Sequence, residues 1–407
     1  MAKKQTAALG FIFVTLLIDV IGIGIIIPIV PVLIQELTGE GLSQASVYGG
    51  WLLFAYAFMQ FVFAPVLGGL SDQYGRRPVL LASLFGFAVD YSIAALAPTL
   101  SWLFVARILA GITGASFTTA SAYIADISTP EKRSQNFGII GAAFGLGFIV
   151  GPVIGGILGQ FGSRVPFIAA AILSVLNWLY GYFILPESLP KEKRRAFDIK
   201  RANPLGSFMR LMKFPAIFSL AIAMFILYVA GQVNPSIWSY FTMMKFNFNE
   251  AWVGYSLGFV GLMVAIVQGG LIRIVIPLLG DWKALMVGFV FHIIGFAAFA
   301  YSTQAWMLFA FIVPFSLGGF AGPALQGIIS KQVPDNEQGE LQGSLTSLMS
   351  ISSIVGPPIF TGLFHFYTET PETRYFPGAP FLLASIICVL AAILAIRSYR
   401  KHHSSSK

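Results

Sequence analysis

Long apolar runs, rather than apolar faces, dominate the hydrophobic pattern of this chain, and short polar stretches separate them. A helix that crosses a bilayer needs about 20 consecutive apolar residues, whereas membrane β-strands show ~10-residue alternation, which is not seen here. The pattern predicts an all-α membrane protein with 12 transmembrane helices. We expect them over residues 9–35, 45–70, 76–98, 100–127, 134–160, 165–186, 215–243, 250–279, 284–302, 305–332, 338–366 and 378–397.

Composition supports this fold class. Hydrophobic residues make up 57% of the 407 positions and charged residues only 10%, against about 25% charged residues in soluble domains. The first apolar run is too long for a signal peptide, so we expect it to remain as a helix. The single cysteine, Cys388, excludes an internal disulfide. The four histidines are scattered, so neither a metal site nor a cofactor is expected.

The basic residues account for the net charge of +8, and they fall in loops between apolar runs. This distribution indicates membrane topology rather than nucleic-acid binding. One side holds Lys3, Lys4, Arg76, Arg77, Lys132, Arg133, Lys283, Lys331 and the run 191–195, and the other holds Arg164, Lys245 and Arg374. Both termini are therefore predicted to be cytoplasmic. Short loops without glycosylation acceptors favour a bacterial inner membrane.

The sequence repeats itself at an offset of 205 residues. Gly151-Pro152 recurs as Gly356-Pro357, and Gly75 recurs as Gly280. Such a parallel repeat is typical of transporters with a central site between two halves. We predict an N-terminal six-helix half (1–188), a basic cytoplasmic linker (189–214) and a C-terminal six-helix half (215–407).

Three ionisable residues lie deep in apolar segments of the first half: Asp19, Asp90 and Arg107. Each costs roughly 2.5–3.5 kcal/mol at a helix centre. Asp90 and Arg107 are nearly equidistant from the turn near residue 98, so they are expected to pair. The alternative to a functional role is a structural one, in which the pair only holds two helices together. The positions 205 residues after these three hold uncharged residues. The repeated architecture alone therefore does not require the charges, and we predict that they have a role in proton coupling.

Polar side chains in other apolar helices indicate an amphipathic pocket. The candidates for substrate binding are Tyr56, Gln60, Gln232, Asn234, Trp238, Gln268, Phe291, His292 and Gln326. Any of the amides has the alternative of bonding a neighbouring helix. His292 has the alternative of packing in the core, although a histidine titrates near neutral pH.

Several motifs together carry a resemblance to the major facilitator superfamily over essentially the full length. The stretch GGLSDQYGRRPV (68–79) is similar to that family's loop between helices 2 and 3. RILAG (107–111) resembles its helix 4 motif, and GAAFGLGFIVGPVIGG (141–156) resembles its antiporter motif in helix 5. Within the family, the chain is most similar to the tetracycline-efflux branch of drug:proton antiporters. The supporting stretches are 54–72, 107–126, 231–238 and 323–345.

The resemblance implies roles for particular residues. It links Asp19, Asp90 and Arg107 to coupling or substrate handling, and it implies a cytoplasmic charge network of Asp72, Arg76 and Asp126. Conformational gating is expected of Gly69, Asp72, Gly75, Arg76, Arg77 and Asp126, and the antiporter motif comprises Gly147, Gly151, Pro152 and Gly155.

One position departs from the branch. The branch usually carries an aspartate in helix 9, where this chain has His292. That acid contributes to handling a metal–tetracycline cation, which a histidine suits less well.

The sequence thus predicts a monomeric, non-enzymatic antiporter that exports an amphipathic small molecule, such as a drug, in exchange for protons by alternating access. Proton-coupled uptake of a sugar or metabolite is the alternative within transporters. A non-transporting receptor or assembly factor leaves the costly charges unexplained. A membrane enzyme lacks a nucleophile–base pair. The expected partners are the substrate, protons and the lipid bilayer, with no nucleic acid.

Overall fold

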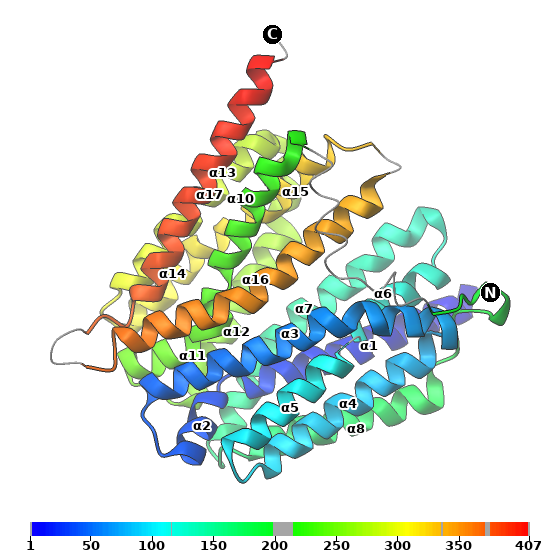
Figure 1. Ribbon diagram of the computed structural model, residues 1–407, viewed down its shortest axis with the longest axis horizontal. Helices are drawn as coiled ribbons and strands as arrows, with labels where there is room; N and C mark the ends of the chain where they lie inside the picture. Colours follow the sequence, from blue (N-terminus) through cyan, green and yellow to red (C-terminus); the bar gives the residue numbers. More distant parts are fainter. Residues whose placement is uncertain (1, 115, 198–214, 335–336, 371–374, 406–407) are drawn as a thin grey trace. The chain divides into compact units, whose positions relative to one another are not determined.

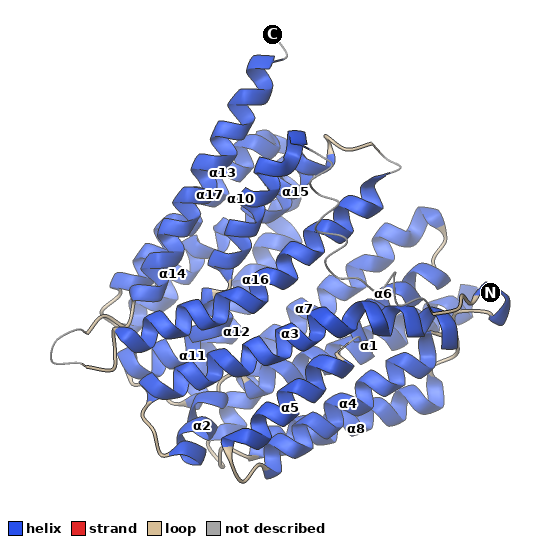
Figure 2. Cartoon of the chain, viewed as in Figure 1, coloured by secondary structure: helices blue, strands red, loops and turns tan. Residues whose placement is uncertain are grey.

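The computed structural model describes residues 2–114, 116–197, 215–334, 337–370 and 375–405, and the regular structure in these ranges is helical (Figure 2). The first part of the chain forms α1 (Ala2–Ile26), α2 (Val30–Thr38), α3 (Leu42–Tyr74), α4 (Arg76–Leu96), α5 (Leu100–Thr113), α6 (Ser116–Ile127), α7 (Pro130–Gly159), α8 (Val165–Ile184) and the 3₁₀ turn η1 (Lys191–Lys193). The second part forms α10 (Pro215–Gly231), α11 (Val233–Phe246), α12 (Glu250–Ile266), the π-turn η2 (Val267–Leu271), α13 (Ile272–Tyr301), α14 (Ala305–Leu317), the 3₁₀ turn η3 (Gly318–Phe320), α15 (Ala321–Ser330), α16 (Gln338–Phe366) and α17 (Ala379–Ser405).

Several predicted spans are broken inside the apolar run. The span 9–35 is two helices, because the chain turns between α1 and α2 around Pro28, which has no N–H to donate. The spans 215–243 and 305–332 are likewise divided, at Gln232 and at η3. Hydropathy registers only that a segment is apolar, so it did not reveal these breaks.

Within the described ranges, eleven helical segments are long and apolar enough to cross a membrane. One of them, Glu250–Tyr301, has 52 residues, or about 78 Å at 1.5 Å per residue. That length exceeds a hydrocarbon core of about 30 Å more than twofold. The segment is interrupted at Gly280, whose φ of 76° and ψ of 158° are not helical. It therefore makes two crossings, which gives the 12 predicted spans.

The helices gather into two compact units. Unit 1 comprises Met1–Glu40, Ala55–Asn203 and Asn249–Gly261, and unit 2 comprises Gly41–Phe54, Pro204–Phe248 and Leu262–Lys407. Helices α3 and α12 each contribute residues to both units. The predicted division into sequence halves stays a prediction, and residues 198–214 of the predicted linker lie outside the described residues.

The two units have cores built from different kinds of side chains. In unit 1, α1 packs along α7 (Figure 1), and a Cβ on Gly24 would lie 2.9 Å from Gly151 Cα, so small residues set that approach. In unit 2, an aromatic cluster fills the core: the ring of Phe381 lies 4.8 Å from that of Phe241 and 5.7 Å from that of Phe299. Ring pairs at these separations add to the stability of a core beyond their burial.

Candidate functional site

The buried ion pair predicted from helix depth is present in unit 1. Arg107 of α5 donates from Nη2 to Oδ2 of Asp90 on α4. Asp90 is fully buried, and its Oδ1 has no hydrogen-bond partner among the described residues. The guanidinium of Arg107 also lies 5.9 Å from the ring centroid of Tyr91. A carboxylate with one oxygen bound to a cation and the other unbound is equipped to accept a proton at the second oxygen.

Asp19 is the second buried acid, and it lies on α1 in the same unit. Asn177 of α8 donates from Nδ2 to Oδ1 of Asp19 at 3.1 Å and to the Thr15 carbonyl at 3.0 Å. The side chain next to Asp90 reaches α1, because a Cβ on Gly22, one turn after Asp19, would lie 3.4 Å from the Tyr91 ring. The sequence reasoning missed Asn177, although an amide within the apolar stretch SVLNWLY was a usable signal.

Tyr56 and Gln60 of α3 line the break between α5 and α6. Gln60 donates from Nε2 to the Gly114 carbonyl at 3.0 Å and to the Tyr56 hydroxyl at 3.2 Å. The end of α5 leaves backbone carbonyls that need donors, and Gln60 supplies one. Gln60 therefore bonds a neighbouring helix, the alternative that the sequence had left open for such amides.

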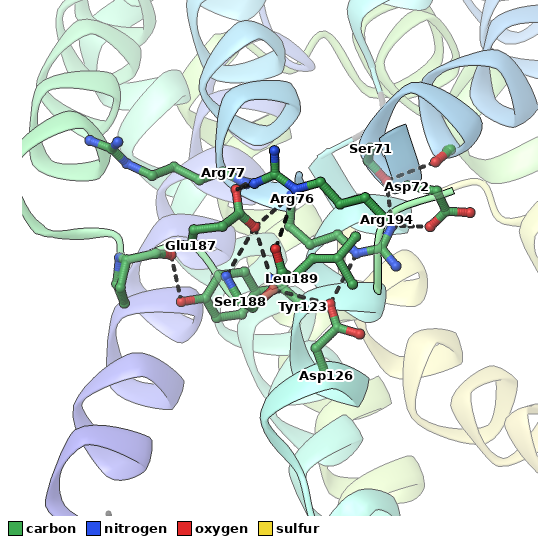
Figure 3. Close-up of polar contacts among 12 residues, drawn as sticks. Ser71, Asp72, Arg76, Arg77, Tyr123, Asp126, Glu187, Ser188, Leu189 and Arg194 are labelled. Atoms are coloured by element: carbon green, nitrogen blue, oxygen red, sulfur yellow. Dashed lines mark hydrogen bonds and ion pairs between the residues drawn. The ribbon is translucent and has the colours of Figure 1, made fainter. Parts of the chain in front are cut away.

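Figure 3 shows a second polar cluster of unit 1, around Arg76 at the start of α4. Arg76 is 9% exposed. Its Nη1 donates to Asp72 and to the Ser71 hydroxyl, and its Nε donates to Asp126 Oδ2 at 3.0 Å. The network of Asp72, Arg76 and Asp126 implied by the resemblance is thus formed, and it ties the ends of α3, α4 and α6 together.

Glu187 belongs to this charge network, but the sequence reasoning did not identify it. Its Oε1 accepts the backbone N–H of Arg76 at 2.8 Å, and its Oε2 accepts that of Arg77 at 3.3 Å. These are among the N–H groups that a helix leaves unsatisfied at its beginning. Gly75 has φ of 106° there, and a Cβ would lie 2.2 Å from Glu187 Oε2. The sequence did hold a signal for Glu187: it is an acid directly after the predicted span 165–186 and shortly before the basic run 191–195.

The chain that follows α8 lies across the same junction. The backbone N–H of Arg195 donates to the Asp72 carbonyl at 3.1 Å, and that of Phe197 donates to Gln73 Oε1 at 3.1 Å. A Cβ on Gly69 would lie 2.8 Å from the Phe197 ring. The beginning of the predicted linker is therefore attached to the end of α3, and a side chain larger than glycine at residue 69 would press against the Phe197 ring.

Arg77 and the residues of the antiporter motif make contacts between helices of unit 1. Arg77 donates from Nη2 to the Tyr182 carbonyl at the end of α8, at 2.7 Å. On α7, a Cβ on Gly147 would lie 2.6 Å from Val20, and one on Gly155 would lie 2.0 Å from the Ile25 carbonyl oxygen. Pro152 faces Gly24 on the same side. The motif residues thus form the surface on which α1 rests.

In unit 2, two irregular turns, η2 and η3, meet near His292. The turn η2 contains Gln268, and it contacts η3. Gln268 lies against Gly319, whereas the His292 ring lies against Gly318, where a Cβ would be 2.1 Å from Cδ2. A π-turn frequently marks a functional position. Gln268 and His292 therefore lie against successive glycines of η3.

The structure shows the packing alternative for His292, and its role in substrate binding stays a prediction. Its ring lies 5.7 Å from the ring of Phe296 and 5.5 Å from that of Phe315, as in a packed core. Its Nδ1, however, is enclosed without a hydrogen-bond partner among the described residues. A buried polar atom of this kind requires an explanation, and a ligand is one.

The other predicted residues of unit 2 are dispersed. Gln232 donates to the Ser353 hydroxyl at 3.0 Å, and Gln326 donates to Gln342 Oε1 at 2.6 Å. The Oδ1 of Asn234 has no hydrogen-bond partner in the described part of the chain. Trp238 packs in the aromatic core, with 2% exposure and its ring 5.3 Å from that of Phe299. Phe291 is partly buried beside His292 in the sequence.

The internal repeat is visible in the backbone and in an ion pair. Gly75 and Gly280 both have positive φ, 106° and 76°, and they are 205 residues apart. Asp281 and Lys331, which form an ion pair in unit 2, are 205 residues after Arg76 and Asp126. The repeat therefore keeps the pair but exchanges the signs of its charges.

Comparison with known proteins identifies a family and relatives that resemble this chain over most of its length. The model of the Major Facilitator Superfamily matches residues 12–357 and also 278–407. The class C tetracycline resistance protein of Escherichia coli is 41% identical over 361 residues, which cover 89% of this chain and 90% of that protein. The class G tetracycline resistance protein of Vibrio anguillarum is 39% identical over 361 residues, which cover 89% and 91%.

Solved structures share the fold. The human organic anion transporter MFSD10 (TETRAN) superposes with a TM-score of 0.73 and 22% identity, covering 96% of this chain and 99% of that chain. The nucleoside transporter NupG superposes with a TM-score of 0.77 and 15% identity, covering 97% and 99%. Together with its 12 spans and its loop motif, these matches show that the chain belongs to the Major Facilitator Superfamily.

Proposed function

We propose that this protein is a proton-coupled antiporter that exports an amphipathic small molecule across a bacterial inner membrane. The observation that carries the proposal is the buried ion pair between Asp90 and Arg107 inside the membrane spans. Intramembrane charges are costly and are usually retained for ion or proton pathways. The tetracycline resistance proteins at 39–41% identity support export of a drug.

Proton exchange at Asp90 changes its ion pair. A proton on the carboxylate cancels its charge, so Arg107 loses its counter-ion and is released to other acceptors. Loss of the proton restores the pair. Asp19 is the second group that takes part in proton exchange. It is held by Asn177 of α8, and α8 packs against α4. Because the same carboxylates change charge in each cycle, they couple proton entry to the conformational change of the transporter.

The proposed substrate is tetracycline-like, because tetracycline resistance proteins are 39–41% identical to this chain. Gln268 and His292 in unit 2 are the residues we assign to its recognition, since they lie against successive glycines of η3 and the His292 Nδ1 is without a partner among the described residues. An imidazole does not supply the negative charge that suits a metal–tetracycline cation. We therefore propose that this protein accepts a broader set of amphipathic compounds.

The Arg76 network is the proposed gate. It joins the ends of three helices through ion pairs, and the side chain of Asp72 is 47% exposed, so the network can form in one state and separate in another. A monomer with both termini in the cytoplasm completes the proposal, and transport then follows alternating access around a central site.

Everted membrane vesicles from cells that express the protein test this function. With an imposed proton gradient, the vesicles are expected to accumulate labelled tetracycline, and a protonophore is expected to abolish the accumulation. Vesicles without the protein are the control. Accumulation that persists with the protonophore would contradict proton coupling. If tetracycline does not accumulate, but another amphipathic drug does, the substrate assignment is wrong and the antiport stands.

A further inference from the structure

A groove of about 440 Å³ lies in unit 1 where α4, α5 and α8 meet. One stripe of α4, from Phe85 to Leu96, forms its floor, and Trp102 of α5 and Val175 of α8 form its sides. Phe85 and Leu96 are 53% and 76% exposed, so the groove opens outward. The spans cross a membrane, and an outward-facing apolar surface there meets lipid chains.

The length of the groove matches one leaflet. The rise from Phe85 to Leu96 is about 16 Å at 1.5 Å per residue. Half of a hydrocarbon core of about 30 Å is about 15 Å. The polar lining side chain, Ser92, donates its hydroxyl to the Ala88 carbonyl at 2.7 Å and so needs no ligand. The groove therefore fits one hydrocarbon chain and offers no recognition of a polar molecule along its length.

A cation marks one end of this groove. Arg164, which precedes α8, donates from Nη1 to the Ala95 carbonyl and from Nη2 to the Ala97 carbonyl, both at 2.8 Å. Ala97 itself lines the groove. A guanidinium has five N–H donors, so these two bonds leave others for an anion. Within the described residues, no carboxylate forms an ion pair with Arg164. The neighbouring acid, Glu36, instead accepts a hydrogen bond from Ser163.

From these observations we propose that the groove binds one phospholipid with an anionic head group. One acyl chain lies along α4, and the phosphate region lies at Arg164. Trp102 stands at the same end, where α5 begins, and tryptophan is enriched at the membrane–water interface. The combination of a chain-length apolar groove and a terminal cation matches an anionic lipid better than a flat polar drug. The inference rests on the membrane fold and not on the proposed transport activity.

Native mass spectrometry of the purified full-length protein tests the site. The protein is incubated with phosphatidylglycerol or with phosphatidylcholine of the same acyl chains, and the fraction that retains one lipid is measured. The wild type is expected to retain phosphatidylglycerol about fivefold better, which corresponds to ~1 kcal/mol per basic residue near anionic lipid. Arg164→Gln is expected to lose this preference, and Arg164→Lys to keep part of it.

Two further variants separate the groove from general charge effects. Ser92→Phe fills the groove and is expected to lower the retention of both lipids. Lys245→Gln is the matched control, because Lys245 donates to the Ala300 carbonyl at 2.8 Å, at the position 205 residues after Ala95. Its preference is expected to equal that of the wild type. Equal retention of both lipids by the wild type, or equal loss in Arg164→Gln and Lys245→Gln, would overturn the proposal. Elution as a monodisperse peak confirms that each variant is folded.

Discussion

At the scale of single residues, the two buried acids differ in their partners. Asp90 has a cation, Arg107, whereas Asp19 has an amide, Asn177. An amide donates one hydrogen bond to the carboxylate without neutralising it, so it fixes the position of Asp19 while leaving it free to exchange a proton. Asn177 is therefore a positioning residue in this account.

Replacement of Asn177 tests that role. Asn177→Leu removes the donor to Asp19, and a buried group left unsatisfied costs roughly 1–3 kcal/mol. We expect gradient-driven transport to fall about tenfold and its pH profile to shift, whereas Asn177→Gln recovers part of the activity. Vesicle transport measured between pH 6 and pH 8 checks this. If the pH profile is unchanged and only the stability of the protein falls, Asn177 acts in packing and does not position Asp19 for proton exchange.

His292 can be displaced without being mutated. A Cβ on Gly318 would lie 2.1 Å from His292 Cδ2, so Gly318→Ala must shift the ring. We expect the KM for the transported drug to rise severalfold. Gly322→Ala, on the next helix, has no atom within 4 Å of its Cβ and serves as the control. If Gly318→Ala changes thermal stability and leaves the KM unchanged, His292 acts only in packing.

At the scale of elements, α1 and α7 approach so closely that backbone atoms of one helix lie where a side chain of the other would begin. This contact therefore tolerates little more than glycine. Gly155→Ala places a Cβ 2.0 Å from the Ile25 carbonyl oxygen, and overpacking of this kind typically costs 1–3 kcal/mol. We expect a lower unfolding midpoint and reduced transport. Gly141→Ala, in the same helix with no atom within 4 Å, is expected to behave as the wild type. Equal midpoints for the two variants, measured by thermal unfolding in detergent, would refute the close approach.

At the scale of the whole molecule, the repeat predicts unequal roles for its two equivalent ion pairs. The side chains of Arg76 and Asp126 are 11% and 22% exposed, whereas Lys331 is 75% exposed. Removing one partner of a buried pair costs roughly 3–5 kcal/mol, whereas a surface pair contributes about 0–1 kcal/mol. Arg76→Glu is therefore expected to abolish transport, and Lys331→Glu to reduce it less than threefold. Comparable losses in transport assays of both variants would contradict this ranking.

The sequence specified the spans, the ion pair of Asp90 and Arg107, and the repeated turn at Gly75 and Gly280, because each depends on local composition or on an offset along the chain. It did not specify the breaks within the spans, because hydropathy is insensitive to backbone direction. It also missed Glu187 and Asn177. Both residues act through partners more than 100 positions away, Arg76 and Asp19, and one sequence does not reveal such contacts.

Exchange and accumulation measured in the same proteoliposomes test the central claim, that Asp90 couples transport to protons. With Asp90→Asn, we predict that a pH gradient no longer drives accumulation of labelled tetracycline or of another drug that the wild type accumulates. Exchange of labelled for unlabelled drug at equal concentrations persists, because it requires no net proton movement. Accumulation at the wild-type level by Asp90→Asn would contradict the account.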